Sequence, residues 1–468
     1  MKKTIAIAGA TGFIGKWFIK KYKNKFNLIG LSRNQVDPNY NSEIPWRQVD
    51  LYSISSTTDA LKNVDIGIYL VHSMQPTTRM NQGSFEDTDI LLADNFSRAA
   101  MACNLQQIIY VGGILPKDGF KMSKHLKSRY EVEKTLGSRS TPLTSIRAGI
   151  IIGPDGSSFK IVQKLVKNLP IMACPSWTKS LNQPLDILDA LRVIDWSIGN
   201  TKSYNQSIEI GGKEVITYMD LLKITAKKMR KKRLIFSFSY VTVGLSKMWV
   251  SLITGSSKNF ISPLVESLKH KMTLSEANKF ELNKTFISLE KSIENALNPK
   301  DELPKNPKFK SSFYEKNTVR SVQRIANPSM KTAEFFARIY PIWLTKRFAS
   351  IIRANFDGKY IKFYLFGVLL LELKVIKSRS DKSRQLFFIT GGILVKRSNL
   401  GWLEFRSVLN DRYLIAAIHE YVPRLPWLFY KYTQAKVHLI VMKQFEKFLS
   451  AIPKKFKKEK KGRLIVSF

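Results

Sequence analysis

The chain opens with Ile5-Ala-Ile-Ala-Gly9-Ala-Thr-Gly12-Phe-Ile-Gly15, a short apolar run followed by three glycines at three-residue intervals. The apolar run predicts a buried strand, and the residues after Gly12 have the spacing of an amphipathic helix. In such a strand–loop–helix unit, the first glycine permits a tight turn and the second lets backbone N–H groups approach a diphosphate. The third lets the helix pack closely on the strand. The pattern therefore predicts a dinucleotide site at Gly9, Thr11, Gly12, Phe13, Ile14 and Gly15.

Short β-rich runs alternate with helical patterns through the first 150 residues. This alternation predicts right-handed crossovers and an α/β fold with a doubly wound parallel sheet, followed by a less regular, small substrate lobe up to about residue 300. The expected strands are Thr4–Ala8, Leu28–Ser32, Gln48–Leu51, Asp65–Val71, Gln107–Val111 and Leu143–Ile152. The expected helices are Gly12–Tyr22, Thr88–Ala102, Lys124–Leu136, Tyr218–Met229 and Ser288–Leu297.

The second half of the chain has a different pattern, which predicts a separate α+β domain. A helical region at about 330–353 precedes strand-like runs at Ile361–Leu371, Leu386–Leu394, Trp402–Val408 and Tyr413–Glu420. In the long final helix, apolar residues at 3–4 residue spacing predict one buried face made of Val437, Ile440, Val441, Phe445, Phe448 and Leu449. We therefore divide the chain into a dinucleotide-binding domain (1–300), a linker (298–317), the α+β domain (318–452) and a polybasic tail (453–468).

The charge of the chain is strongly basic and unevenly distributed. Its 468 residues include 76 Lys and Arg against 36 Asp and Glu, a net charge of +40. The first 120 residues hold 13 basic and 10 acidic residues, so the excess lies in the later parts. Such a balance attracts an anionic membrane surface or nucleic acid, although a genome that favours lysine would also produce part of it. With no nucleic-acid recognition module present, we expect no specific nucleic-acid partner and consider peripheral membrane contact through the basic run 227–233 and the tail.

Cysteine usage and hydropathy give the expected compartment. Cys103 and Cys174 lack metal-ligand spacing, which predicts neither a disulfide nor a metal site. We find no signal peptide pattern and no uncharged apolar run near 20 residues. A cytoplasmic protein is therefore expected, with peripheral association at the inner membrane as the alternative. The sequence does not predict the oligomeric state.

The end of the second predicted strand bears on the choice of nicotinamide cofactor. An NAD(H) site places an acid there, which accepts hydrogen bonds from the ribose hydroxyls. This chain has Ser32-Arg33 instead, and a cation beside a hydroxyl suits a 2′-phosphate. We therefore expect NADP(H) rather than NAD(H), unless Arg33 is an ordinary exposed loop cation. Asp50 and Leu51, at the end of the third strand, are expected to flank the adenine. Leu70, Val71 and His72, at the end of the fourth, are expected beside the ribose and nicotinamide half.

Several glycine-containing motifs resemble the atypical, extended branch of the short-chain dehydrogenase/reductase superfamily. They are Gly9–Gly15, Val111-Gly112-Gly113, Arg147-Ala-Gly149-Ile-Ile-Ile-Gly153-Pro154, and Ile210-Gly-Gly212 followed by Thr217-Tyr218. The likeness covers about residues 1–300. Within the superfamily, this part of the chain is similar to NmrA-like proteins and to the NADPH-binding accessory subunit of respiratory complex I. The resemblance implies a Rossmann fold and contacts of Gly112 and Gly149 with the cofactor. The later residues resemble a domain of unknown function similar to helix-grip lipid-binding modules, which implies an apolar ligand cavity between its sheet and last helix.

The resemblance leaves the catalytic residues open. It implies a Tyr acid, a Lys four residues later and a Ser that polarises a carbonyl, but glycine stands where the Ser is expected, in Gly112-Gly113. By spacing, Tyr130 and Lys134 match the Tyr–Lys pair. The resemblance also implies a Ser directly before the basic residue, and Ser128 stands directly before Arg129. By this criterion His125 and Arg129 match better, and we favour them. Residues five apart on a helix point about 140° apart, so the two registers exclude each other.

Two functions from different classes follow from these motifs. The first is an NADP-dependent oxidoreductase whose substrate, a small or apolar molecule, the sequence does not identify. The second is a non-catalytic protein that holds NADPH for a structural or redox-sensing role, as the complex I subunit implies. A membrane-surface protein is a third alternative.

Overall fold

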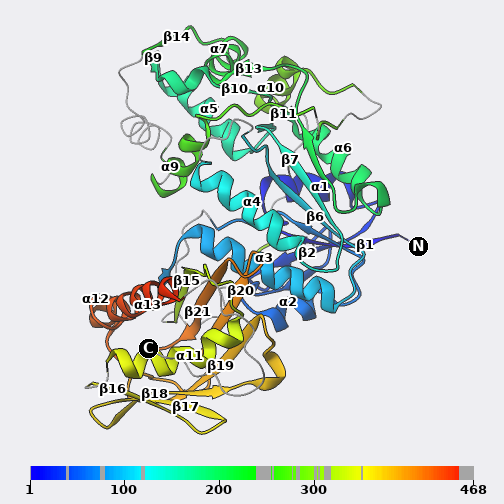
Figure 1. Ribbon diagram of the computed structural model, residues 1–468. Helices are drawn as coiled ribbons and strands as arrows, with labels where there is room; N and C mark the ends of the chain where they lie inside the picture. The colour runs from blue at the N-terminus through cyan, green and yellow to red at the C-terminus, as the bar shows by residue number, and fades with distance from the viewer. Residues whose placement is uncertain are drawn as a thin grey trace. The chain divides into compact units, whose positions relative to one another are not determined.

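The computed structural model describes residues 2–37, 42–73, 80–116, 122–238, 255, 258–276, 278–280, 285–299, 303, 306–309, 318–348 and 351–452. The chain forms two compact units (Figure 1). The first comprises Met1–Pro76 and Asp89–Phe313, and the second comprises Thr77–Thr88 and Tyr314–Phe468. Most of the expected linker and the whole expected tail lie outside the described residues.

The first unit is built on a seven-stranded sheet in which every neighbouring pair is parallel. Its order is β12-β7-β6-β4-β1-β2-β3, so the chain reverses direction across the sheet between β1 and β4. This confirms the doubly wound fold and places the topological switch point beside the glycine loop. The strands are β1 (Thr4–Ala8), β2 (Asn27–Ser32), β3 (Trp46–Gln48), β4 (Ile66–Tyr69), β6 (Gln107–Gly113), β7 (Leu143–Ala148) and β12 (Ser207–Ile210).

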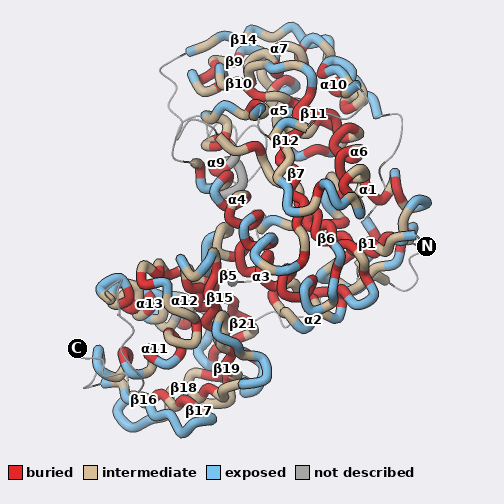
Figure 2. The backbone as a smooth tube through the Cα atoms, turned by 45° about the vertical axis from the view of Figure 1, so that its right-hand side comes forward, coloured by how far each residue is buried: buried red, intermediate tan, exposed pale blue. Residues whose placement is uncertain are grey.

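Helices cover both faces of this sheet because its strands are apolar on both sides. Ile5 and Ile7 of β1 share one core with α1 (Phe13–Tyr22) and α6 (Ile187–Ser197). Ala6 and Ala8 share the other core with three helices, and these are α2 (Ile54–Leu61), α3 (Phe85–Ala102) and α4 (Lys124–Leu136). Figure 2 shows the central strands of the sheet as buried.

The remaining elements of the first unit form the small lobe. Its core joins Phe159 of α5, Leu221 of α7 and Ile293 of α10. The lobe elements are β8 (Ile151–Ile152), α5 (Ser157–Asn168), β9 (Ile171–Cys174), η1 (Ser176–Lys179), β10 (Leu181–Asn182), β11 (Leu185–Asp186), η2 (Thr201–Ser203), β13 (Ile216–Thr217), α7 (Tyr218–Lys228), β14 (Leu234–Ser237), α9 (Lys258–Ser267) and α10 (Leu289–Leu297).

Two of the expected strands of this unit were wrong in extent. The run expected at Gln48–Leu51 begins and ends earlier, as β3, because Asp50 and the residues after it form the turn into α2. The run expected at Leu143–Ile152 forms two strands, β7 and β8, with Gly149 between them. Both errors arise where polar or glycine-containing turns follow directly on apolar residues.

The second unit is an eight-stranded, mostly antiparallel sheet in the order β16-β17-β18-β19-β20-β21-β15-β5, in which only β5 pairs in parallel. Helices α11 and α13 pack on one face, with Trp343 and Phe445 at 4.9 Å between ring centroids. The elements are β5 (Met80–Gln82), β15 (Val319–Ala326), α11 (Ala333–Arg347), β16 (Ile352–Phe356), β17 (Tyr360–Leu365), β18 (Val368–Val375), η3 (Lys377–Arg379), β19 (Arg384–Gly391), β20 (Trp402–Val408), β21 (Tyr413–Tyr421), α12 (Trp427–Tyr432) and α13 (Gln434–Ala451).

The structure corrects the prediction for this unit in two places. The run Ile361–Leu371 is two strands joined by a turn at Phe366 and Gly367, both with positive φ. The face expected to be buried on the last helix is only partly so, because Val437 and Ile440 are exposed. Strands β5, β15 and β16 were not predicted.

A buried ion cluster holds three strands of this sheet together. The Glu404 carboxylate on β20 accepts hydrogen bonds from Arg384 Nε of β19 at 2.7 Å and from Arg406 Nη2 at 2.9 Å, and it lies 3.1 Å from His419 Nε2 of β21. Burial alone would raise the pKa of Glu404, but the charges of Arg406 and Arg384 hold it well below its ordinary value. A carboxyl with a depressed pKa stabilises the fold above its unfolded-state pKa, and this stabilisation is lost as pH falls.

We therefore expect Glu404→Gln to lower the free energy of unfolding of the second unit by about 3–5 kcal/mol, because it leaves buried cations uncompensated. Urea unfolding followed by circular dichroism measures the change. Glu334→Gln, which breaks an exposed pair with Arg338 on α11, is the matched control and should cost less than about 1 kcal/mol. Equal effects of the two substitutions would contradict this role of the cluster.

Candidate functional site

The glycine loop between β1 and α1 has the geometry that the sequence predicts. Gly9 has a φ of +90°, and a Cβ there would lie 3.0 Å from the backbone of Leu70. A Cβ on Gly15 would lie 2.6 Å from the Gly9 carbonyl oxygen, so only glycine allows α1 to approach the turn this closely. Gly12 is the N-cap of α1 and no side chain caps it, which leaves the first N–H groups of the helix for another acceptor.

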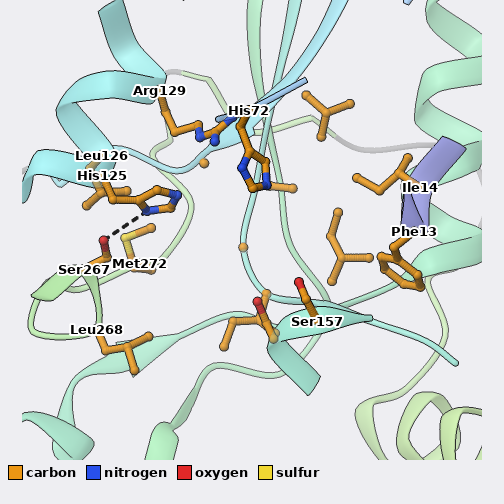
Figure 3. A pocket seen from close by; sticks show the side chains of 18 of the residues that line it. Phe13, Ile14, His72, His125, Leu126, Arg129, Ser157, Ser267, Leu268 and Met272 are labelled. Atoms are coloured by element: carbon orange, nitrogen blue, oxygen red, sulfur yellow. Dashed lines mark hydrogen bonds between the residues drawn. The ribbon is translucent and has the colours of Figure 1, made fainter. Parts of the chain in front are cut away.

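Beside this loop lies a cleft of about 270 Å³. Figure 3 shows Phe13 and Ile14 of α1 on one side of it, and His125 and Arg129 of α4 on the other. Gly112, near the end of β6, and Gly149, directly after β7, line it as well. Six of the residues that the sequence predicts for the site are therefore brought together at the carboxyl edge of the sheet: Phe13, Ile14, Gly112, His125, Arg129 and Gly149.

The two alternative registers on α4 occupy different sides of the helix. His125 and Arg129 line the cleft, whereas Tyr130 and Lys134 lie outside the residues that line it. The Lys134 ammonium lies 5.3 Å from the centroid of the Tyr130 ring, so these two side chains contact each other. The geometry therefore favours the His125 register.

His125 contacts Ser267 of the small lobe, which in turn contacts Ser123 at the start of α4. Its Nδ1 lies 3.1 Å from Ser267 Oγ at the end of α9, as the dashed line in Figure 3 marks. Ser267 Oγ lies 2.8 Å from Ser123 Oγ, the N-cap of α4, and donates to the Pro263 carbonyl at 2.9 Å. Burial, together with the nearby Arg129 cation, lowers the pKa of His125 to about 3, so the imidazole is neutral at physiological pH.

Arg129 is the charge around which the cleft is organised. Its side chain is buried, and its backbone carbonyl accepts a hydrogen bond from Tyr110 Oη at 3.3 Å. Buried Asp89 on α3 provides the opposite charge and accepts hydrogen bonds from Ser73 N at 2.7 Å and Ser128 Oγ at 3.2 Å. Burial raises the pKa of Asp89, and the charge of Arg129 opposes this shift.

Sequence analysis placed His72 at the end of the fourth strand, beside the cofactor, and missed Ser267 and Asp89. His72 follows β4 and faces the cleft. Its side chain is partly open to solvent. Desolvation by the surrounding protein, together with the charge of Arg129, lowers its pKa. The end of a central parallel strand was the available signal for His72, because such strand ends meet at the site. Ser267 comes from a distant segment and carries no local signal.

The other predicted cofactor residues do not line this cleft. Arg33 is exposed after β2, and Gln48 Nε2 donates to its carbonyl at 3.3 Å. Asp50 is buried and its carboxylate accepts from Tyr52 N at 3.1 Å. The remaining predicted residues, partly buried at the glycine loop and at the ends of strands, are Thr11, Leu51, Leu70 and Val71.

Two glutamates of α4, Glu131 and Glu133, are buried. Glu133 bonds Arg147 Nη2 at 2.7 Å and accepts from Ser145 Oγ at 2.7 Å and Ser207 Oγ at 3.0 Å. Burial alone would raise the pKa of Glu133, but the hydrogen bonds from Arg147 lower it. Glu133 thus fastens α4 to β7 and β12.

With this geometry in hand, comparisons with known proteins bear on the first unit. Residues 5–139 match the NAD dependent epimerase/dehydratase family. A search of curated proteins finds auxiliary protein GraX of Staphylococcus aureus, 27% identical over 146 residues. That match covers 31% of this chain and 43% of the relative, so the chain spans less than half of the curated relative's length.

Among solved structures, a nucleoside-diphosphate-sugar epimerase from Staphylococcus aureus is similar at 13% identity and a TM-score of 0.50, covering 62% of this chain and 99% of that one. The triphenylmethane reductase of Citrobacter sp. complexed with NADP(H) is similar at 15% identity and a TM-score of 0.48, covering 62% and 99%. At 13% identity, the likeness to the epimerase structure establishes the fold of the first unit and nothing more. The family match supports a nicotinamide cofactor there.

A second, larger cleft of about 1100 Å³ lies in the second unit between α11 and strands β16 to β19. Apolar side chains such as Ile342, Ile361 and Phe387 line it, with Arg338 and Lys346 beside them. The resemblance implied a cavity against the last helix, but the inner side of α13 is packed on the sheet. Within the described residues, no helix is long and apolar enough to cross a membrane, and no cluster of three potential metal-ligating side chains occurs.

Because its pKa is lowered, we expect the imidazole of His125 to stay neutral from pH 8 down to about pH 4 in NMR titration of the five histidines. The group is neutral in the fold and protonated in the unfolded chain below its ordinary pKa, so it destabilises the fold increasingly as pH falls below about 6.5. The His125→Gln spectrum assigns the resonance. A titration midpoint near 6.5 would contradict the buried, Arg129-facing position.

Proposed function

We propose that the first unit binds NADP(H) and acts as an oxidoreductase of the short-chain dehydrogenase/reductase type. The observation that carries the proposal is the uncapped N-terminus of α1, held against β1 by Gly9 and Gly15 next to the cleft. Unpaired N–H groups and the helix dipole at that point suit a diphosphate. The substrate is a small or apolar molecule whose identity this geometry does not define.

The proposal assigns each part of the cofactor to residues along the carboxyl edge of the sheet. The backbone of Gly12 to Ile14 would hold the diphosphate, and Ser32 with Arg33 would hold the 2′-phosphate. Asp50 and Leu51 would lie along the adenine, Leu70 and Val71 along the ribose, and Gly112 and Gly149 along the nicotinamide. When bound, such a cofactor supplies or accepts a hydride.

The chain's own contribution to chemistry would come from α4. Arg129 places a buried positive charge at the cleft, where it would stabilise negative charge that develops on a carbonyl oxygen. Because the Ser267 hydroxyl donates to the Pro263 carbonyl, neutral His125 donates its Nδ1–H to Ser267 Oγ, which fixes the ring and leaves the lone pair on Nε2. The other ring nitrogen, Nε2, is left to face the cleft.

One observation favours the alternative, in which the protein holds NADPH without turnover. Glycine stands at Gly112 and Gly113, where the superfamily has its hydroxyl. A Cβ on Gly113 would lie an ordinary 3.6 Å from Leu126 Cδ2, whereas a Cβ on Gly112 would lie 2.8 Å from the Tyr110 ring. Packing therefore requires glycine at Gly112 but not at Gly113. With Tyr130 outside the cleft and His125 neutral, the site lacks a strong proton donor. Bound NADPH that no substrate oxidises would support this holding role over the enzyme.

We expect Gly12→Asp to weaken NADPH binding at least about a hundredfold, because like charges about 4 Å apart near a protein surface repel by about 4 kcal/mol. Aspartate is a favourable N-cap residue, so the helix should still form. Fluorescence titration of NADPH measures the affinity. Thr332→Asp, which places the same residue at the N-cap of α11 in the second unit, is the matched control. Unchanged affinity in Gly12→Asp would overturn the diphosphate site.

Arg33→Asp tests the cofactor preference separately. We expect it to weaken NADPH binding by about 10- to 100-fold, the range of a charge-assisted hydrogen bond, and to leave NADH binding nearly unchanged. The same titration with both cofactors gives the ratio. Equal losses for NADPH and NADH would show that Arg33 does not contact a 2′-phosphate.

A further inference from the structure

The last two helices of the second unit carry an exposed apolar face that its core does not use. On α12 and the first half of α13, Phe429, Tyr432, Val437 and Ile440 are 64, 56, 58 and 54% exposed. The opposite side of the same helices is buried through Tyr430, Met442, Phe445 and Leu449. The two helices therefore present apolar residues both inward to the sheet and outward to solvent, and large exposed apolar patches mark interaction sites.

The same face is basic. Between Arg424 and Ile452 the sequence holds five basic residues and one acidic residue, Glu446. Glu446 is only half-exposed and accepts a hydrogen bond from the Ala326 backbone N–H at 3.1 Å, so its carboxylate is directed to β15. The chain continues past α13 with seven basic residues and one acidic residue over 453–468. The outer surface of these helices therefore attracts anions.

Cations and apolar groups are interleaved on this surface. Lys436 Nζ lies 5.3 Å from the centroid of the Tyr432 ring. Lys443 and Lys447 are exposed, and they follow Ile440 at helical spacing, so the three share one side of α13. Aromatic and aliphatic side chains beside lysines are typical of helices that lie in a membrane–water interface, where lysine stems extend toward the headgroups.

We propose that this face docks on a bilayer surface that contains anionic lipid. Phe429, Tyr432, Val437 and Ile440 enter the acyl boundary, and Lys436, with its neighbours on α13, contacts headgroup phosphates. A second copy of the chain fits less well, because a symmetric contact would bring like charges together. Nucleic acid offers phosphates but nothing that covers four apolar side chains. The proposal is independent of cofactor binding in the first unit.

The test is flotation of the full chain with vesicles of phosphatidylcholine alone and of phosphatidylcholine mixed with phosphatidylglycerol. We expect binding only to the mixed vesicles, weakening with salt. Combined serine substitution of Phe429, Tyr432, Val437 and Ile440 should reduce the affinity at least about a hundredfold, since each buried apolar side chain contributes about tenfold. Combined glutamine substitution of Lys436, Lys443 and Lys447 should cost about fivefold per lysine and flatten the salt dependence.

Phe366→Ser is the matched control, because Phe366 is 76% exposed at the turn between β17 and β18. It should bind like the unchanged protein. Equal loss in this control, equal binding to both vesicle types, or a dimer in sedimentation that the serine variant abolishes would each overturn the proposal. Thermal unfolding checks that every variant folds, and the single substitutions Phe429→Ser and Ile440→Ser replace the combined variant if it does not.

Discussion

The close contact between the first turn of α1 and the turn after β1 is the constraint on which the first unit depends. The helix can start there only because Gly15 has no Cβ to meet the Gly9 carbonyl. This contact directs the N-terminal end of α1 at the carboxyl edge of the sheet, where β4, β6 and β7 also end. Residues of the cleft lie at or just after the end of each of these strands, so a steric condition at one turn fixes where the site forms.

Within that site, burial and one buried cation together set the state of the neighbouring groups. Burial lowers the pKa of both His72 and His125, the charge of Arg129 lowers it further, and the same charge offsets the effect of burial on Asp89. A positively charged cleft with neutral imidazoles is well suited to hold an anionic or electron-rich group, but it has little capacity to donate a proton. The same arrangement therefore supports cofactor retention and limits acid catalysis, which is why the two proposed functions are hard to separate by geometry.

The sequence predicted those features that depend on local pattern. Helix Lys124–Leu136 and strands Thr4–Ala8 and Trp402–Val408 have the predicted bounds, because a single apolar periodicity governs each of them. The glycine loop was equally predictable, since its conformation is imposed by adjacent residues. Ser267 approaches His125 from 142 residues away, and Glu133 pairs with a strand that follows it, so burial of these groups is set by tertiary packing. The error at Val437 and Ile440 has a related cause: apolar spacing shows that a face is apolar, not what covers it.

The route of the chain through the two units has a consequence for how they can be separated. Residues 77–88 lie within the sequence of the first unit, yet they belong to the second, where β5 pairs with β15 and Asp87 bonds Arg324 Nε at 2.6 Å. Cutting the chain once near residue 300 would therefore not separate two complete units. The C-terminal fragment would keep seven strands and expose the edge of β15, where backbone groups that now bond β5 would invite pairing with other chains.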